Sequence, residues 1–295
     1  MIVKEKIGEG FLDLRICDNL ELMAEIKDNT IDLIYCDILY GTGKDFGDYQ
    51  DLKPIRSEIE KHYMPRVKEM YRILKPTGSI YLQMDFRINH WLRCLMDNVF
   101  GYDNFLNEII WWYRRFPAKQ KNYQAQHDNI MIYTKTKHHT YNEQWTEKSK
   151  KSSKLGKRLV DTGNGTRTTI FTNEETKTRL GNVWEISFLN SQAKERLGYA
   201  TQKPKELIER IIKTSSNEGD LVADFYAGSF TTAEVCKDLK RNFIGCDINP
   251  NGFAKAKERG LFNFIVYNVK YMSRFFYGLY LMLGICIFYF LGRDF

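Results

Sequence analysis

The fold is decided by the stretch LVADFYAGSFTT, residues Leu221–Thr232. It opens with an apolar, strand-like run, and its first acid, Asp224, leads into a turn of small residues. A helix-like run then continues to Leu239, and a second apolar strand, Phe243–Cys246, ends at another acid, Asp247. This strand–helix–strand unit has its second acid about 20 residues beyond the turn, a spacing that places a carboxylate on a ribose. The stretch therefore predicts a nucleoside-binding parallel sheet.

A second acidic turn, Asp37–Tyr40, follows another short apolar strand, Ile31–Cys36. That run is broken only by Asp32 and is fit for a buried parallel strand. The turn offers an acid beside an aromatic ring, and those two groups suit a flat ring that carries an amine. Together the two turns suggest that one protein holds a nucleoside-type cofactor and a base as substrate.

Strands and helices alternate along most of the chain. Pro76–Gly78 is expected to turn the chain into a strand. Further strands are expected at 79–83, 105–112 and 129–133, and helices at 58–74, 90–99 and 205–214. This alternation predicts a doubly wound α/β sheet.

With its turns in this order, the chain resembles the β class of amino-methylating DNA methyltransferases, which use S-adenosylmethionine (AdoMet). Members carry a catalytic Asp-Pro-Pro-Tyr turn first and a cofactor turn, Asp-x-Phe-x-Gly-Ser-Gly-Thr-Thr, near the end. The resemblance runs from about Asp18 to Asn251 and includes Leu74–Ser79, His127-Asp128, Gly181–Trp184 and Thr201–Pro204. It implies a mostly parallel, Rossmann-like methyltransferase sheet with an inserted target-recognition region.

The resemblance also implies roles for individual residues. The Asp37 carboxylate and the Ile38 carbonyl would accept hydrogen bonds from the target amine, and Tyr40 would stack on the flipped base. No metal is required. Asp18, whose match is weaker, also fits a turn or helix cap. The residues implied for AdoMet are Asp18, Thr201, Gln202, Lys203, Asp224, Tyr226, Gly228, Ser229, Thr231 and Asp247.

The chain departs from the family pattern in both turns. Ile38-Leu39 replaces Pro-Pro, which keeps both carbonyls but loses about 0.4–1 kcal/mol of rigidity per position. Phe225 replaces a usual Pro, and Phe230 replaces the second Gly of the cofactor turn. If position 230 needs a positive φ or close approach to AdoMet, Phe is an obstacle. If it only begins the next helix, the ring can point into the core.

An acid at the head of the catalytic turn favours adenine N6, because the cytosine-N4 enzymes of the family usually have Ser there. The leading hypothesis is thus a site-specific adenine-N6 methyltransferase of duplex DNA, from a restriction–modification system. A cognate restriction endonuclease and a homodimer are partners to consider. The alternatives are a cytosine-N4 enzyme and a DNA-binding protein of the same fold with impaired or lost catalysis.

The stretch of about 114–182 is polar and basic. Between Trp111 and Val160 the chain has twelve Lys or Arg against three acids, interleaved with aromatic and amide residues. Such a pattern favours a polyanion, because neutralised phosphates release counterions. We expect the target-recognition region here, with DNA contacts at Arg114, Arg115, Lys119 and Lys121.

The methyltransferase domain is expected to span 1–268, leaving a tail at 269–295. In that tail Phe275–Leu291 has no charge and lies near the lower length limit of a membrane helix. A packing element or a change of reading frame would explain it equally, so membrane attachment is the less favoured interpretation. Six cysteines stand singly without zinc spacing, which favours a cytoplasmic protein, and His138-His139 lacks partners for a metal site.

Overall fold

The computed structural model describes residues 1–262 except 9, 47–49, 117, 118, 120, 148–156, 162, 164–166 and 172–176. Within them, one nine-stranded sheet has the order β1-β2-β13-β12-β3-β4-β6-β5-β11. Its strands are β1 (Ile2–Ile7), β2 (Gly10–Ile16), β3 (Ile31–Asp37), β4 (Leu74–Met84), β5 (Phe105–Trp112), β6 (His127–Thr134), β11 (Val183–Glu185), β12 (Leu221–Asp224) and β13 (Asn242–Asp247). The five strands from β2 to β4 in this order are parallel. The expected mostly parallel α/β fold is confirmed.

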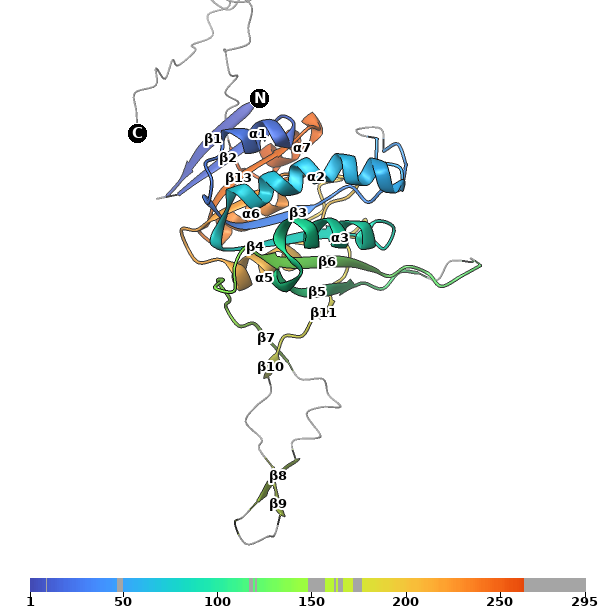
Figure 1. Ribbon diagram of the computed structural model, residues 1–295, viewed down its shortest axis with the longest axis vertical. Helices are drawn as coiled ribbons and strands as arrows, with labels where there is room; N and C mark the ends of the chain where they lie inside the picture. The colour runs from blue at the N-terminus through green and yellow to red at the C-terminus, as the bar shows by residue number, and fades with distance from the viewer. Residues whose placement is uncertain are drawn as a thin grey trace, which may run out of the picture.

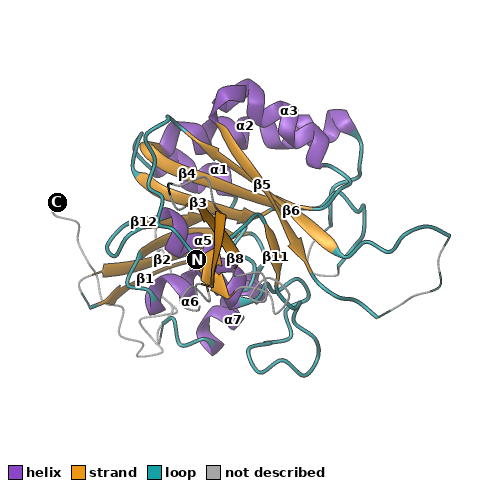
Figure 2. Ribbon diagram, turned by 90° about the horizontal axis from the view of Figure 1, so that it is seen from below, coloured by secondary structure: helices purple, strands orange, loops and turns teal. Residues whose placement is uncertain are grey.

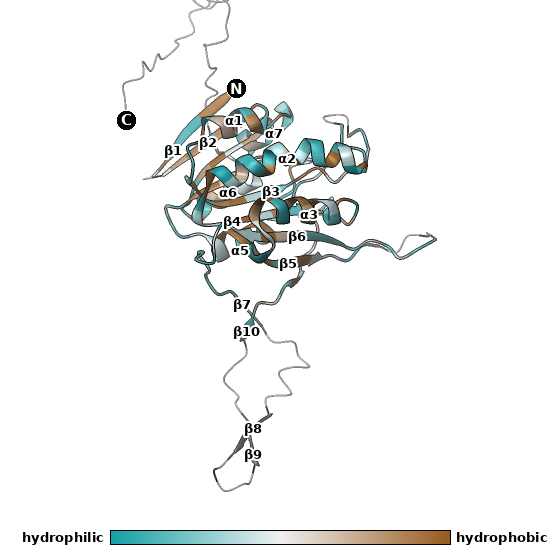
Figure 3. Cartoon of the chain, in the orientation of Figure 1, coloured by the Kyte–Doolittle hydropathy of each residue, from teal (hydrophilic) through white to brown (hydrophobic). Residues whose placement is uncertain are grey.

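Helices cover both faces of the sheet, which is the doubly wound arrangement. They are α1 (Asn19–Glu25), α2 (Arg56–Ile73), α3 (Asn89–Phe100), α5 (Lys205–Ser215), α6 (Thr231–Asp238) and α7 (Pro250–Glu258). The first three lie on one face and the last three on the other (Figure 2). The central strands are apolar, whereas the outer surface of α2 is mainly hydrophilic (Figure 3). Burial of these apolar strands between two helical layers is the main stabilising term of the fold.

Two details of the sheet differ from the expectation. Pro76–Gly78 does not form a separate turn, since β4 begins directly after α2 and pairs with β3 through an irregularity between Ile31 and Leu33. The antiparallel hairpin β1–β2 was not expected, and it forms one edge of the sheet beside β13.

The basic stretch 114–182 contributes to more than one part of the structure. Its expected strand, β6, pairs between β4 and β5 in the main sheet. Two small ribbons then extend away from the sheet (Figure 1). They are formed by β7 (Trp145–Glu147) with β10 (Lys177–Arg179), and by β8 (Lys157–Asp161) with β9 (Arg167–Phe171).

The expected apolar tail, 269–295, lies outside the described residues. Among the residues that are described, no helix is long and apolar enough to cross a membrane.

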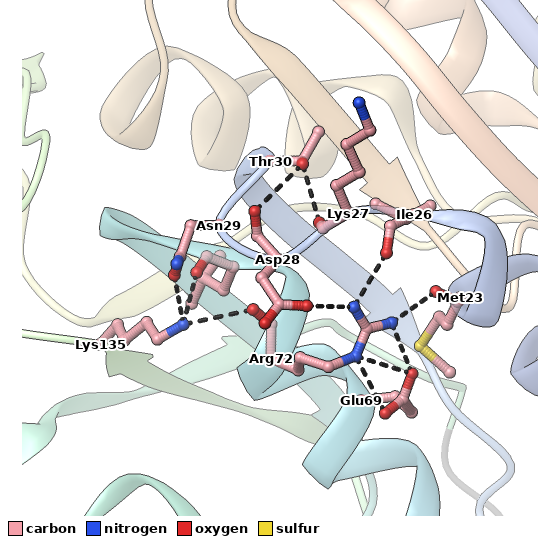
Figure 4. Close-up of polar contacts among 10 residues, drawn as sticks. Met23, Ile26, Lys27, Asp28, Asn29, Thr30, Glu69, Arg72 and Lys135 are labelled. Atoms are coloured by element: carbon pink, nitrogen blue, oxygen red, sulfur yellow. Dashed lines mark hydrogen bonds and ion pairs between the residues drawn. The ribbon is translucent and has the colours of Figure 1, made fainter.

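A polar cluster holds the chain just before the amino end of β3. Arg72, at the end of α2, donates hydrogen bonds to the carbonyls of Met23 (2.8 Å) and Ile26 (2.9 Å). It also pairs with Asp28 at 2.5 Å and Glu69 at 2.7 Å (Figure 4). The Arg72 guanidinium thus links the turn before β3 to the last turn of α2. This link fixes the position at which β3 begins.

Candidate active site

The expected site residues gather where the sheet changes direction. From the neighbours β3 and β12, the chain continues outward on opposite sides, to β4 and to β13. Loops that leave two such strands form a crevice at their carboxyl ends. A cavity of about 490 Å³ opens there, within the range of small-molecule pockets. Every residue expected to be catalytic or to bind cofactor lines it: Asp18, Asp37, Ile38, Tyr40, Thr201, Gln202, Lys203, Asp224, Tyr226, Gly228, Ser229, Thr231 and Asp247.

Asp37 ends β3, and both of its carboxylate oxygens have partners. The Tyr40 hydroxyl lies 2.9 Å from Oδ1, and the Lys203 ammonium forms an ion pair with Oδ2. Burial raises the pKa of the Asp37 carboxyl, and the positive charge of Lys203 opposes that rise. The next residue, Ile38, is anchored through its backbone N–H to the Gln83 carbonyl at 3.1 Å, which orients the turn.

A second carboxylate, Asp128, completes this network. Its Oδ2 lies 2.7 Å from the Tyr40 hydroxyl, and its Oδ1 accepts a hydrogen bond from Tyr113 at 2.9 Å. The Gln83 amide donates to the Tyr40 oxygen at 3.1 Å. The Tyr40 phenol has one proton for two carboxylates, so it can donate to only one of them at a time. Tyr40 is therefore held by its hydroxyl at the side of the cavity.

The cofactor turn is shaped by its two acids. Asp224 is buried, and its oxygens accept hydrogen bonds from the Tyr226 N–H at 3.0 Å and the Thr232 hydroxyl at 2.6 Å. Burial raises the pKa of Asp224 to about 7. Asp247 accepts from the Gly228 N–H at 2.8 Å. Gly228 has φ +49°, a conformation that suits glycine, so the turn brings its backbone to the cavity wall.

Phe230 combines the two possibilities left open by the sequence. Its φ is +55°, the left-handed conformation that costs an L-residue about 1–2 kcal/mol. Its side chain is completely buried and packs edge-to-face on Phe253, with 5.5 Å between ring centroids. The ring thus occupies the core, and the cavity stays open despite the missing glycine.

Two of the expected cofactor residues are engaged in local structure. Asp18 caps α1 by accepting from the Leu20 N–H at 2.8 Å, and it pairs with Arg66 at 2.9 Å. Gln202 accepts from the Leu197 N–H at 2.8 Å and donates to the Glu195 carbonyl at 2.6 Å. Both side chains brace the cavity wall that they line.

Several cavity residues were missed by the sequence reasoning. His62 and Arg66 stand one turn apart on α2, and the Nε2 of His62 lies 3.3 Å from the Tyr226 hydroxyl. Burial, helped by the nearby Arg66 charge, lowers the pKa of His62 to about 4, so its ring is neutral at pH 7. The available signal was two polar residues four apart on α2, each directly before a buried position of that helix.

Arg259 was also missed, and no sequence pattern points to it. Its buried guanidinium donates to the Ser229 carbonyl at 2.8 Å and the Thr231 hydroxyl at 2.8 Å, and it pairs with Glu234. It holds the cofactor turn from behind, at the start of α6.

The four residues expected to bind DNA lie between β5 and β6, outside the cavity lining. This segment begins at the strand end where Asp37 also lies, and it extends away from the sheet (Figure 1). All four are exposed, and Arg115 also lies over the Tyr113 ring and donates to its hydroxyl at 3.1 Å. Within the described ranges, no three His, Cys, Asp or Glu side chains are grouped as a metal ion would need.

The chain matches a family model, described as DNA methylase (N6/N4), over residues 31–258. Type II methyltransferase M.HpaI of Haemophilus parainfluenzae is 35% identical over 83% of this chain and 73% of its own length. DNA adenine methyltransferase YhdJ of Escherichia coli is 28% identical over 79% and 76% of the two chains. The cytosine-N4-specific PvuII DNA methyltransferase matches in fold, with TM-score 0.59 and 18% identity over 86% and 88%.

Proposed function

This chain belongs to the N6/N4 family of DNA methylases, and we propose that it transfers a methyl group to adenine N6 in duplex DNA. The observation that carries the choice of base is the Asp37 carboxylate at the head of the catalytic turn, in the same cavity as the cofactor turn. Its methyl donor is AdoMet.

Asp37 and Ile38 supply the chemistry that the base needs. The exocyclic amine of adenine is a weak nucleophile because its lone pair is conjugated into the ring. Two acceptors that bind both amine hydrogens favour a tetrahedral nitrogen with an available lone pair. The carboxylate of Asp37 is the stronger acceptor of the two because its hydrogen bonds are charge-assisted.

The cavity fits AdoMet in size and in its donors and acceptors. Gly228 brings its backbone close without a Cβ, and Asp247 offers carboxylate oxygens at the spacing expected for ribose hydroxyls. When bound, AdoMet supplies an electrophilic methyl group. The protein then contributes orientation of the two reactants, which is a large share of such catalysis.

We expect duplex DNA to lie beside the β5–β6 segment, at the carboxyl end of β3. Base flipping into the cavity costs a few kcal/mol, and stacking on an aromatic ring such as Tyr40 returns about 1–3 kcal/mol. The relatives named as type II methyltransferases support a role in a restriction–modification system. For such a role we expect a cognate restriction endonuclease and a location in the cytoplasm.

The test is transfer of labelled methyl from AdoMet to unmethylated bacterial genomic DNA, followed by nucleoside analysis. The wild type is expected to yield N6-methyladenine, and Asp37→Ala is expected to yield none. Thr136→Ala is the control and should retain transfer. Thr136 follows the end of β6 that lies away from the cavity, and its hydroxyl donates to the Pro76 carbonyl. N4-methylcytosine as the product would overturn the choice of base. No transfer by a folded wild type would overturn the proposal and leave a DNA-binding protein.

A further inference from the structure

The ammonium of Lys203 is enclosed by the catalytic turn. It pairs with Asp37, lies 3.1 Å from the Thr201 carbonyl and stands 5.3 Å from the centre of the Tyr40 ring. The two partners of the ion pair are largely buried, with 12% of the Lys203 side chain and 17% of the Asp37 side chain exposed. Sequence reasoning assigned Lys203 to the cofactor and Asp37 to the base, so this contact joins two separate roles.

The ion pair conflicts with the work proposed for Asp37. The ammonium on Oδ2 and the Tyr40 hydroxyl near Oδ1 each take one acceptor site of the carboxylate that has to accept the target amine. The amine nitrogen also gains positive charge as it is methylated, and a neighbouring ammonium opposes that charge. Lys203 must therefore leave Asp37 before transfer.

An anion in the same cavity can draw Lys203 away. The side chain stands on a flexible four-carbon stem, and its ammonium is a mobile point charge. Among the described residues that line the cavity, the other cation is Arg66, and it is already bound to Asp18 at 2.9 Å and Asn19 at 2.7 Å. The α-carboxylate of AdoMet is an anion of the required kind.

We propose that Lys203 is a latch, a positioning residue that pairs with Asp37 in the empty site. When the cofactor binds, the Lys203 side chain moves and pairs with the cofactor carboxylate instead. This inference rests on the proposed function. Cofactor binding then releases Asp37, so the base acceptor becomes free only when a methyl donor is present.

The test measures binding by calorimetry, with two ligands and no DNA. S-adenosylhomocysteine carries the carboxylate, whereas 5′-methylthioadenosine has the same nucleoside and sulfur without it. Asp37→Asn removes the competing anion, so it should tighten S-adenosylhomocysteine binding at least about fivefold and leave methylthioadenosine binding unchanged. Lys203→Met should weaken the binding of S-adenosylhomocysteine and leave the binding of methylthioadenosine unchanged. In the Lys203→Met background, Asp37→Asn should have no effect.

Controls separate the latch from general electrostatics. Asp85→Asn removes a buried carboxylate that follows β4 and pairs with Arg87 and not with Lys203, and it should leave both affinities unchanged. If Asp37→Asn tightens binding equally in the Lys203→Met background, simple repulsion acts and the latch is overturned. If Asp37→Asn leaves the affinity for S-adenosylhomocysteine unchanged, the latch is also overturned. Arg66 is then the partner of the ligand's carboxylate. Lys203→Gln gives the same readout if Lys203→Met fails to fold.

The two proposals fail in different ways. A wild type that binds neither ligand contradicts the proposed function. A wild type that methylates DNA while Asp37→Asn leaves S-adenosylhomocysteine affinity unchanged contradicts the latch alone.

Discussion

The hydroxyl of Tyr40 lies 2.7 Å from the carboxylate of Asp128, although 88 positions separate the two residues in the chain. The contact exists because β6 runs antiparallel beside β4, which brings the first residues of β6 to the carboxyl end of β3. The aromatic residue of the catalytic turn is thus oriented from a strand that the basic stretch supplies.

Asp128→Asn is expected to lower kcat/KM for methyl transfer about 10- to 100-fold. The asparagine replaces the charged acceptor of a hydrogen bond worth about 1.5–3 kcal/mol, so Tyr40 is then held mainly by its contacts with Asp37 and Gln83. Steady-state kinetics on genomic DNA measures the effect. Tyr113→Phe is the matched control, since it removes one Asp128 contact and keeps those to Tyr40 and Gln83. Equal losses in both variants would mean that Asp128 acts only through general packing.

Among variants of Phe230, the glycine variant should be more stable than the alanine variant, which is the reverse of the usual order. Both Phe230→Ala and Phe230→Gly empty a buried site, at about 3–5 kcal/mol of unfolding free energy. Glycine adopts φ +55° without strain, so Phe230→Gly should be more stable than Phe230→Ala by about 1 kcal/mol. Urea unfolding of the two variants at one pH decides this. An alanine variant that is the more stable would contradict the left-handed backbone.

Asp224 should make the stability of the protein depend on pH. Its carboxyl has a pKa of about 7 in the folded state and ionises near 3.8 when unfolded. The folded state therefore binds the extra proton, so the contribution is full below pH 4 and is lost as pH rises through 7. Between pH 5 and pH 8 the loss is about 3 kcal/mol, at 1.36 kcal/mol per pH unit up to the folded pKa.

Asp224→Asn is the variant that isolates this group. Its amide keeps a hydrogen bond to Tyr226 and can donate to Thr232, and it does not titrate. Urea unfolding at pH 5 and pH 8 should show a smaller decrease for the variant than for the wild type, by about the stated amount. Parallel decreases would show that Asp224 is already ionised in the folded state at pH 5.

Lys121→Gln should reduce the salt dependence of binding to duplex DNA. Each phosphate contact contributes a slope of about −0.9 to log K against log salt, so the slope should become shallower by about one. Fluorescence anisotropy across a salt series measures it. Lys240→Gln is the matched control, because Lys240 is 76% exposed but precedes β13, at the sheet end away from the cavity. A change of slope in both variants would point to non-specific charge effects.

The sequence predicts most of the central sheet because its strands are continuous apolar runs. The strand expected at 105–112 has those bounds, and the helix expected at 205–214 ends one residue later. The hairpin β1–β2 was missed because charged residues interrupt its alternation, as in Lys4 to Lys6. A strand at a sheet edge exposes one face, so its apolar signal is weaker.

The lining of the cavity could be predicted from the two acidic turns, but its internal contacts could not. Nothing in the local pattern of Thr201–Pro204 indicates that Lys203 reaches Asp37, which lies 166 positions away. The same holds for Arg259, whose guanidinium reaches the cofactor turn from the end of α7. Such contacts depend on the strand order of the whole sheet, whereas a sequence pattern reports only which residues are neighbours on one element.

The pairing of β3 with β12 has a consequence for synthesis of the chain. Cys36 and Phe225, which meet across this pair, are 189 positions apart, and β12 is made long after β3. At about 5–20 residues per second, the ribosome needs roughly 10–40 seconds to supply the missing neighbour. During that time one edge of β3 presents unpaired backbone groups, which can recruit a strand from another nascent chain. The junction that unites acid and cofactor is thus also an edge that the growing polypeptide leaves unpaired during synthesis.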